Sequence, residues 1–318
     1  MPLLLASDIG GTHARFMLVR SEGEALYPLV EATLAVADHA TLEDAGAAFL
    51  SSQGKVRVDR ACLAVAGPIE GRRARLTNAA WRIDADRFAA ALGIAHVRLH
   101  NDFEAAASGI GELDRSGLVS IQEAPPTEDG MRVVIGAGTG LGVAYLLPGR
   151  PSARIIAGEG GHAAFAPAND RQMDLRAFIA RETVRVTNEH VLSGAGLVRL
   201  YAFASKASEL PDEVRSDGAA AVSRRARSGD RAAADALRLF VEVFGSVAGD
   251  HALSVLATGG VFIAGGIAPR LADRFASNEF LSAFRDKAGH AALMRRMPVA
   301  LVRDARLGLL GAARLALT

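Results

Sequence analysis

Apolar and polar positions form successive runs along the chain, and these runs predict strands that alternate with helices. The first apolar run, residues 3–9, is followed by two glycines, a threonine and a second apolar run over residues 14–20. Two apolar runs joined by a tight Gly-Gly turn predict a β-hairpin. Residues 41–52 then carry a helical pattern, and residues 60–71 predict a buried strand ending in a Gly-Pro turn.

The next segment, residues 81–102, predicts a helix followed by a strand. Asp84 is expected to cap this helix, and Gly93 stands where the end of the helix needs a left-handed residue. A further helix is expected from residue 103 onward. Strands that alternate with helices of this length indicate an α/β protein.

The pattern of the opening hairpin returns later in the chain. After a polar, proline-containing loop over residues 123–130, residues 131–147 again carry an apolar run, a Gly/Thr turn and an apolar run. This echo indicates two related α/β halves with one hairpin each. Residues 170–257 are expected to be mostly helical, with the longest amphipathic pattern over residues 232–257, and residues 304–317 predict a closing helix.

Composition and charge narrow the class of protein. The 318 residues suit two domains of ordinary size, half of them are hydrophobic, and the net charge is +1. This balance gives no global field for nucleic acid or an anionic membrane. The basic run over residues 215–231 is diluted by Ala, Ser, Gly and Asp, so we expect a solvated helix face or loop there.

The cysteine and hydropathy pattern indicates a cytoplasmic protein. The single cysteine, Cys62, lies in an apolar run and is expected to be a buried thiol, which fits a reducing cytosol. The apolar residues before Asp8 are too few for a signal-peptide core. The longest uncharged stretch, residues 252–269, holds four glycines and a proline, so no membrane span is expected.

Three Gly/Thr-rich turns, residues 8–15, 136–142 and 263–270, each follow an apolar strand pattern. Glycines there let backbone N–H groups approach an anion closely. Any one of them could be only a tight turn, but three together favour a phosphate site. The P-loop motif is absent. The G-x-G-x-x-A spacing over residues 158–163 leads to a proline, so a Rossmann site is not expected, and no His/Cys spacing indicates a metal centre.

Several polar groups stand in apolar surroundings. Asn101 and Asp102 end a predicted strand and begin a helix, where a carboxylate can be a helix cap or a general base. Glu159 and His162 lie among glycines and small apolar residues, with little room expected for solvation, and Glu189 precedes an apolar, then glycine-rich stretch. Such groups need partners, and sugar hydroxyls can supply them. An ordinary salt bridge or cap remains the alternative for each.

These residues resemble the ATP-dependent bacterial glucokinases of the non-repressor type. The resemblance covers nearly the whole chain, in order, through SDIGGTHAR, AVAGPIEG, LTNAAW, HNDFEAAA, GAGTGLGVA, GEGGHAAFAP, NEHVLSGAGLVRLY, GGVFIAGGIAPR and GLLGAA. The segments GEGGHAAFAP and VLSGAGLVRLY are typical of this family. DIGGT alone would indicate only the superfamily of sugar kinases, heat-shock ATPases and actin.

The resemblance implies a fold and a reaction. The fold is the duplicated, actin-like ATPase (ribonuclease H-like) α/β fold, with two domains and a cleft between them. The small domain would span residues 1–110, completed by the C-terminal helix at about 301–318, and the large domain residues 111–300. The reaction is transfer of the γ-phosphoryl group of ATP to the 6-hydroxyl of glucose, with Mg²⁺ as cofactor and a homodimer as the assembly.

The same resemblance implies roles for particular residues. Asp102 matches the catalytic base, with Asn101 beside it as a hydroxyl ligand. The residues that match ligands of the other glucose hydroxyls are Glu159, His162 and Glu189. The positions that match the nucleotide site are Ser7, Asp8, Ile9, Gly10, Gly11 and Thr12 around the first phosphate loop, Gly138 and Thr139 in the second, and Gly265 and Gly266 near the adenosine. Asp8 also matches the aspartate that helps to hold Mg²⁺.

Two positions depart from the family pattern: His13 stands where Asn is usual, and Ser7 where Gly is usual. The role of His13 stays open. Among rival functions, the repressor-related sugar kinases often carry a cysteine-rich zinc motif, which one cysteine cannot form. A sugar-sensing regulator would need a helix-turn-helix before the first strand, and none is expected. A hexose kinase with another sugar, a kinase using polyphosphate or ADP, and a non-catalytic sugar-binding protein remain alternatives.

Overall fold

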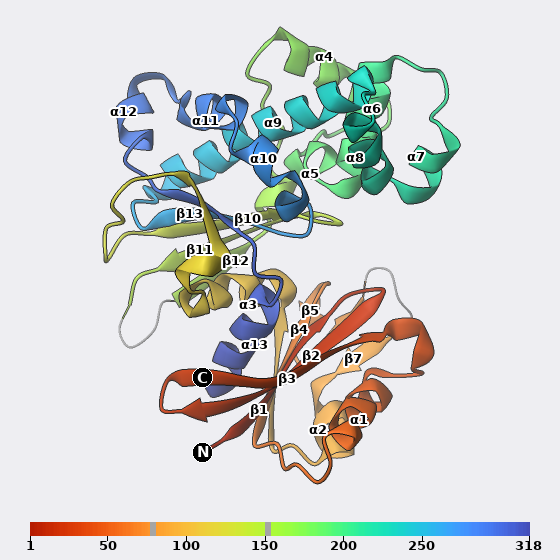
Figure 1. The fold of residues 1–318 in the computed structure, drawn as a ribbon, viewed down its shortest axis with the longest axis vertical. Helices are drawn as coiled ribbons and strands as arrows, with labels where there is room; N and C mark the ends of the chain where they lie inside the picture. Colours follow the sequence, from red (N-terminus) through yellow and green to blue (C-terminus); the bar gives the residue numbers. More distant parts are fainter. Residues whose placement is uncertain (77–80, 150–153) are drawn as a thin grey trace. The chain divides into compact units, whose positions relative to one another are not determined.

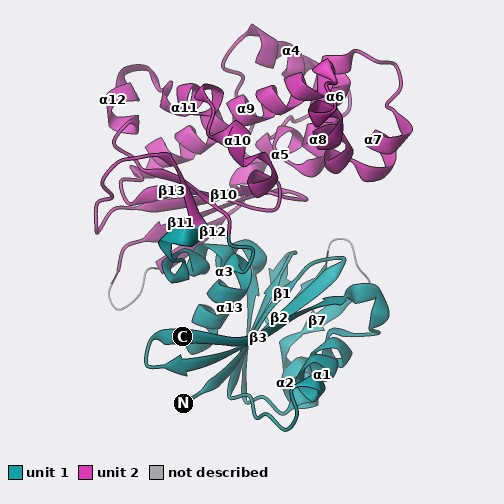
Figure 2. Cartoon of the chain, viewed as in Figure 1, with its two compact units in different colours: residues 1–117, 304–318 teal, residues 118–303 magenta. Residues whose placement is uncertain are grey.

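The computed structural model describes residues 1–76, 81–149 and 154–318. Residues 77–80, which form most of the LTNAAW segment, lie outside the described residues. The chain divides into two compact units (Figure 2). Unit 1 comprises residues 1–117 and 304–318, and unit 2 comprises residues 118–303.

Unit 1 is built on a five-stranded mixed sheet (Figure 1). In spatial order its strands are β3 (Ala25–Ala35), β2 (His13–Glu22), β1 (Leu3–Ile9), β4 (Arg60–Val65) and β8 (His96–Asn101). The predicted hairpin is confirmed, since β1 and β2 pair antiparallel, and β4 and β8 run parallel to β1. Strand β3 was not predicted. Its apolar run is interrupted by Pro28, where the register shifts, and proline is tolerated there because β3 is an edge strand.

The helices of unit 1 follow the predicted pattern. They are α1 (Leu42–Ser52), α2 (Ala85–Leu92), α3 (Asp102–Gly109) and α13 (Leu307–Leu317). Asp84 caps α2 by accepting hydrogen bonds from two backbone N–H groups, and Gly93 ends it with φ 65°, so both predictions are confirmed. Helix α13 packs against α3 and β1. Three short strands form a separate small sheet: β5 (Ile69–Glu70), β6 (Arg73–Arg75) and β7 (Arg82–Asp84).

Unit 2 repeats the central arrangement of unit 1. Its six-stranded sheet has the order β12 (Arg154–Gly158), β11 (Leu141–Leu147), β10 (Arg132–Ala137), β13 (Gly260–Ala264), β14 (Val299–Val302) and β9 (Leu118–Gln122). Strands β10 and β11 form an antiparallel hairpin, and β13 runs parallel to β10, as β4 does to β1. The predicted echo between the two halves of the chain is therefore confirmed, together with the α/β class.

The remaining helices belong to unit 2, and α9 runs beside its sheet (Figure 1). They are α4 (Asp170–Ile179), α5 (Asn188–Val191), α6 (Gly194–Ser205), α7 (Asp212–Asp217), α8 (Ala219–Arg227), α9 (Arg231–Val255), α10 (Ala272–Phe275), α11 (Asn278–Arg285) and α12 (Ala291–Met294). The long amphipathic pattern is confirmed as α9, which buries Leu237, Phe240 and Phe244.

Two further predictions concern Cys62 and the basic run over residues 215–231. Cys62 is fully buried and free, as predicted, and burial raises the pKa of its thiol well above the usual range. Within the basic run, Arg225 pairs with Glu213 and Asp230, and Arg224 pairs with Asp217. Among the described residues, no helix is both long and apolar enough to cross a membrane.

Candidate active site

The first Gly/Thr turn joins β1 to β2. The Gly10 N–H donates to the His13 carbonyl at 3.0 Å and closes the turn. In the described part of the chain, the backbone N–H groups of Gly11 and Thr12, and the Thr12 hydroxyl, have no hydrogen-bond partner. Three neighbouring donors that the protein leaves unused are what a phosphate group needs.

The residues that lead into this turn contribute unequally. Ser7 and Ile9 are fully buried, and the Ser7 hydroxyl donates to the Cys62 carbonyl at 3.1 Å. Both side chains therefore belong to the core of unit 1. Only their backbone groups remain for the nucleotide-binding role predicted for them.

Asp8 points to the beginning of α13. A Cβ atom added to Gly308 would lie 3.1 Å from Asp8 Oδ2, so the glycine leaves room for the carboxylate. Arg15 Nη1 lies 3.7 Å from the same oxygen and donates to the Ala305 carbonyl at 2.6 Å. Burial raises the pKa of Asp8, and the Arg15 guanidinium opposes that rise.

Asn101 and Asp102 lie at the junction of β8 and α3. Asn101 Oδ1 caps the helix by accepting from the N–H groups of Phe103, at 2.9 Å, and Glu104, at 3.4 Å. The cap considered for Asp102 is therefore Asn101 instead, because Asp102 is already the first residue of the helix. With its oxygen used in this way, Asn101 has its NH₂ group left to donate to a ligand.

The pKa of Asp102 differs from that of an ordinary aspartate. Burial, and then repulsion from the Asp8 carboxylate, raise its pKa to about 6, against a hydrogen bond from the Phe103 N–H. A carboxylate with a pKa near neutrality is a better proton acceptor than an ordinary aspartate and is still mostly ionised at pH 7. Unit 1 thus joins a proton acceptor, a second carboxylate and a turn rich in unused donors.

The second Gly/Thr turn joins β10 to β11 in unit 2. The Gly138 N–H donates to the Gly140 carbonyl at 2.8 Å, and the Gly138 carbonyl accepts from Gly194 at the beginning of α6, at 2.9 Å. Thr139 is exposed at the tip. Within the described ranges, the N–H groups of Thr139 and Gly140 have no partner, as in the first turn.

Glu189, in α5, is attached to this second turn. Its Oε2 accepts from the Leu141 N–H at 2.9 Å. A Cβ atom added to Gly140 would lie 2.4 Å from that oxygen, so the turn requires glycine at this position to admit the carboxylate. A predicted sugar ligand and a predicted phosphate loop are therefore joined by a direct hydrogen bond.

Glu159 and His162 have surroundings that differ from the expectation. Their side chains are 89% and 61% exposed, with His162 Nε2 3.8 Å from Glu159 Oε2, so the expected lack of solvation is wrong. The cause is the position of the segment: it leaves the edge strand β12 and forms a short 3₁₀ turn, Gly160–His162, on the surface of unit 2. Hydrogen bonds from Phe165 to Val186 and from Asn188 to Ala163 hold this segment beside α5.

Gly265 and Gly266 follow β13. Gly265 has φ 83°, and a Cβ atom there would lie 2.4 Å from the Ala137 carbonyl oxygen, which also accepts from the Ile267 N–H at 3.2 Å. This turn therefore lies against the end of β10, where the second Gly/Thr turn begins. Each unit thus brings its predicted site residues to the carboxyl ends of its parallel strands, where α/β sheets commonly bind ligands.

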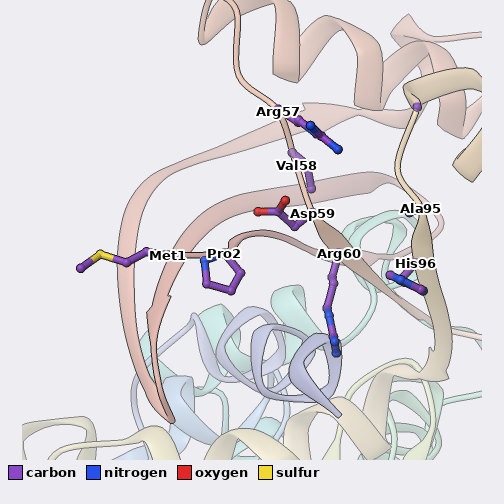
Figure 3. A pocket seen from close by; sticks show the side chains of 9 residues that line it. Met1, Pro2, Arg57, Val58, Asp59, Arg60, Ala95 and His96 are labelled. Carbon is purple, nitrogen blue, oxygen red and sulfur yellow. The ribbon is translucent and has the colours of Figure 1, made fainter.

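A hollow of about 520 Å³ in unit 1 lies elsewhere (Figure 3). Its lining includes Pro2, Asp59, Arg60 and His96, which stand at the amino ends of β1, β4 and β8. Asp8 and Asp102 lie at the opposite ends of β1 and β8. The topology of the sheet therefore separates this hollow from the candidate active site.

The Asp8 carboxylate is chemically suited to Mg²⁺, which prefers oxygen ligands. No group of three or more His, Cys, Asp or Glu side chains that could hold a metal occurs in the residues described. Mg²⁺ is commonly held by one or two carboxylates together with substrate phosphates and water. Asp8 fits that arrangement, because its carboxylate oxygens lie next to a turn whose N–H donors could bind the phosphates.

Comparison with known proteins decides the family. A family model described as glucokinase matches residues 5–318. The chain belongs to the glucokinase family. A glucokinase of Nostoc punctiforme is 36% identical over 335 residues, with 98% of each chain covered. The crystal structure of a glucokinase from an Antarctic psychrotroph is 33% identical, has a TM-score of 0.89 and covers 99% of both chains.

A more distant structure shows the fold alone. The ROK family glucokinase from Streptomyces griseus, in complex with glucose and AMPPNP, is 23% identical with a TM-score of 0.67 and covers 99% of both chains. The two solved structures confirm the expected actin-like ATPase fold. The family model and the relatives of more than 30% identity confirm a glucose-phosphorylating enzyme of the glucokinase family.

Three residues of this glucokinase-family site were not singled out from the sequence. Arg15 braces Asp8, Gly308 makes room for it, and Gly140 admits Glu189. Arg15 and Gly140 lie inside the segments SDIGGTHAR and GAGTGLGVA, so the sequence indicated that these positions matter. Their partners could not be predicted, because Arg15 binds a carbonyl 290 residues away.

Proposed function

We propose that this glucokinase-family enzyme transfers the γ-phosphoryl group of ATP to the 6-hydroxyl of glucose, with Asp102 as general base. The observation that carries the proposal is the state of Asp102, held at the start of α3 with its pKa raised to about 6. Phosphoryl transfer depends mainly on positioning and charge neutralisation. A base that takes the proton of the attacking hydroxyl completes those requirements.

Each unit offers polar groups that can bind the hydroxyls of a sugar. Asp102 accepts the 6-hydroxyl proton, and the Asn101 NH₂ group donates to a neighbouring hydroxyl. Glu159, His162 and Glu189 hold the remaining hydroxyls. Ionised carboxylates accept from two hydroxyls each, so a sugar that lacks one of them would leave a partner unpaired and bind much more weakly.

The phosphates would be held by the two Gly/Thr turns. The unused N–H groups of Gly11 and Thr12, and of Thr139 and Gly140, support this assignment. Gly265 and Gly266 would face the adenosine. Asp8 would hold Mg²⁺, which supplies charge neutralisation at the phosphates when bound. The AMPPNP bound by the Streptomyces griseus enzyme supports ATP as the donor.

The assembly and compartment are also proposals. A homodimer in the cytoplasm fits the family. A chain with a single cysteine, which is free, suits a reducing compartment, because proteins of oxidising compartments commonly use cysteines in disulfides.

A coupled assay tests the reaction. Purified protein with glucose, Mg²⁺ and ATP is monitored through NADPH formation by glucose-6-phosphate dehydrogenase, in parallel with Asp102→Ala. We expect turnover with ATP that is lost in the variant, while calorimetry still detects glucose binding. Turnover only with polyphosphate or ADP would overturn the donor assignment. Glucose binding without turnover under any donor would indicate a sugar-binding protein.

A further inference from the structure

The turn that carries Glu159 and His162 rests on two aromatic residues of unit 2. A Cβ atom added to Gly160 would lie 2.8 Å from Cε1 of His251, in α9. One added to Gly158 would lie 3.7 Å from Cε2 of Tyr145, in β11. Tyr145 and His251 thus lie against the backbone on either side of Glu159.

Tyr145 and His251 are also bound to each other. The Tyr145 hydroxyl lies 2.7 Å from His251 Nδ1, and the two rings are 6.0 Å apart. Burial lowers the pKa of His251 and raises that of Tyr145, so both are neutral at pH 7. The hydrogen bond links β11 with α9, and Tyr145 pairs with Ile156 of β12, the strand that leads into the turn.

Glu159 and His162 depend on the backbone of the turn for their direction. Glu159 and His162 are themselves exposed, and their own pairing distance of 3.8 Å is too long to fix either side chain. Exposed side chains are ordered mainly by the backbone that carries them. The backbone of this turn is enclosed at Gly160 by His251 and by Val143 of β11, whose side chains would lie 2.8 and 2.9 Å from an added Cβ atom. At Gly161 it is enclosed by the Leu141 carbonyl oxygen of β11, 2.2 Å from an added Cβ atom.

We propose that Tyr145 and His251 are positioning residues for sugar recognition, which set the direction of Glu159 and His162 through the turn between them. This inference rests on the proposed sugar-binding role of Glu159 and His162. Neither aromatic residue touches the sugar in this account. Their hydrogen bond holds the turn in the geometry that binds glucose, and its loss weakens glucose binding without altering the nucleotide site.

Four variants and one control test this role. Tyr145→Phe removes the hydroxyl and keeps the ring. His251→Leu removes the hydrogen-bonding nitrogen at similar volume, whereas His251→Asn keeps a hydrogen-bonding group near the Nδ1 position. Glu159→Gln reports whether the turn binds sugar. Tyr201→Phe is the matched control, since Tyr201 is a buried tyrosine of unit 2 whose hydroxyl donates to Asp230 at 3.2 Å.

The KM values for glucose and ATP, kcat and the Tm are measured for each variant. We expect Tyr145→Phe and His251→Leu to raise the glucose KM about three- to ten-fold, with the ATP KM and kcat changed less than about two-fold. His251→Asn should raise the glucose KM less than His251→Leu. Tyr201→Phe should lower the Tm and leave the glucose KM unchanged.

The outcomes separate the two proposals. If Glu159→Gln raises the glucose KM and Tyr145→Phe does not, the positioning role is wrong and the sugar site stands. The same conclusion follows if Tyr201→Phe raises the glucose KM as much as Tyr145→Phe does. If Glu159→Gln leaves the glucose KM unchanged, the sugar-binding role of the turn is wrong, and the positioning role falls with it.

Discussion

The two Gly/Thr turns occupy equivalent places in the two sheets, yet the carboxylates near them have different surroundings. In unit 1, burial raises the pKa of both Asp8 and Asp102, and the Asp8 carboxylate raises the pKa of Asp102 further. In unit 2, Glu189 accepts a hydrogen bond from the turn itself, and the side chain of Glu159 is 89% exposed. Burial raises the pKa of a carboxylate and so suits it to proton transfer, whereas a carboxylate that is held by a hydrogen bond or exposed suits recognition.

The same comparison shows how one hairpin scaffold serves both purposes. Each hairpin leaves backbone N–H groups unused at its turn, which suits an anion. The element that packs beside each turn differs. Near the first turn, the start of α13 lies against Asp8; at the second turn, the carboxylate of Glu189 comes from α5.

The largest expected effect tests the carboxylates of unit 1. Asp102→Asn keeps the size of the side chain and removes the base, so kcat should fall roughly 100- to 10,000-fold while the affinity for glucose changes little. The control is Asp84→Asn, because asparagine caps a helix as well as aspartate does. Steady-state kinetics with calorimetry decides the matter, and a kcat close to that of the parent would exclude Asp102 as the base.

The second prediction separates the two carboxylates of unit 2. Glu189→Gln should raise the KM for glucose and for ATP, roughly ten-fold for glucose, because Glu189 is attached to the second turn. Glu159→Gln should raise only the glucose KM, because Glu159 is not bonded to that turn. Identical patterns in the two variants would contradict the link between Glu189 and the phosphate loop.

A smaller effect is expected from the glycine that admits Glu189. Gly140→Ala would place a Cβ atom 2.4 Å from Glu189 Oε2, so the turn or the carboxylate must move. We expect a loss of about 1–3 kcal/mol in the free energy of unfolding, together with higher KM values for both substrates. Gly289→Ala is the control, since a Cβ atom there meets nothing within 4 Å. Equal denaturation midpoints for the two variants would show that the contact is not required.

Much of the scaffold could be predicted from local pattern. Both hairpins, the caps at Asp84 and Gly93, and the long helix α9 depend on residues close in sequence, and each is confirmed. Strand β3 was missed because Pro28 and Glu31 obscure its apolar alternation. Its place at the edge of the sheet tolerates them.

The surroundings of the site residues were less accessible to prediction. Glu159 and His162 stand among glycines and small apolar residues, which indicated burial, but glycine-rich turns also occur at surfaces, as this one does. The partner of Glu189 lies 48 residues away, at Leu141. Such contacts depend on the packing of whole elements, so pattern alone could name the residues but not their partners.

The central claim, that burial in unit 1 prepares Asp102 for proton transfer, is tested most directly by the pH dependence of kcat/KM for glucose. Because only the ionised carboxylate can accept the proton, kcat/KM should fall about ten-fold per pH unit below a pKa of about 6 and be constant above it. The Asp102→Asn variant should lack this acid limb. A limb near pH 4, where an ordinary aspartate titrates, or an unchanged limb in the variant, would contradict the account.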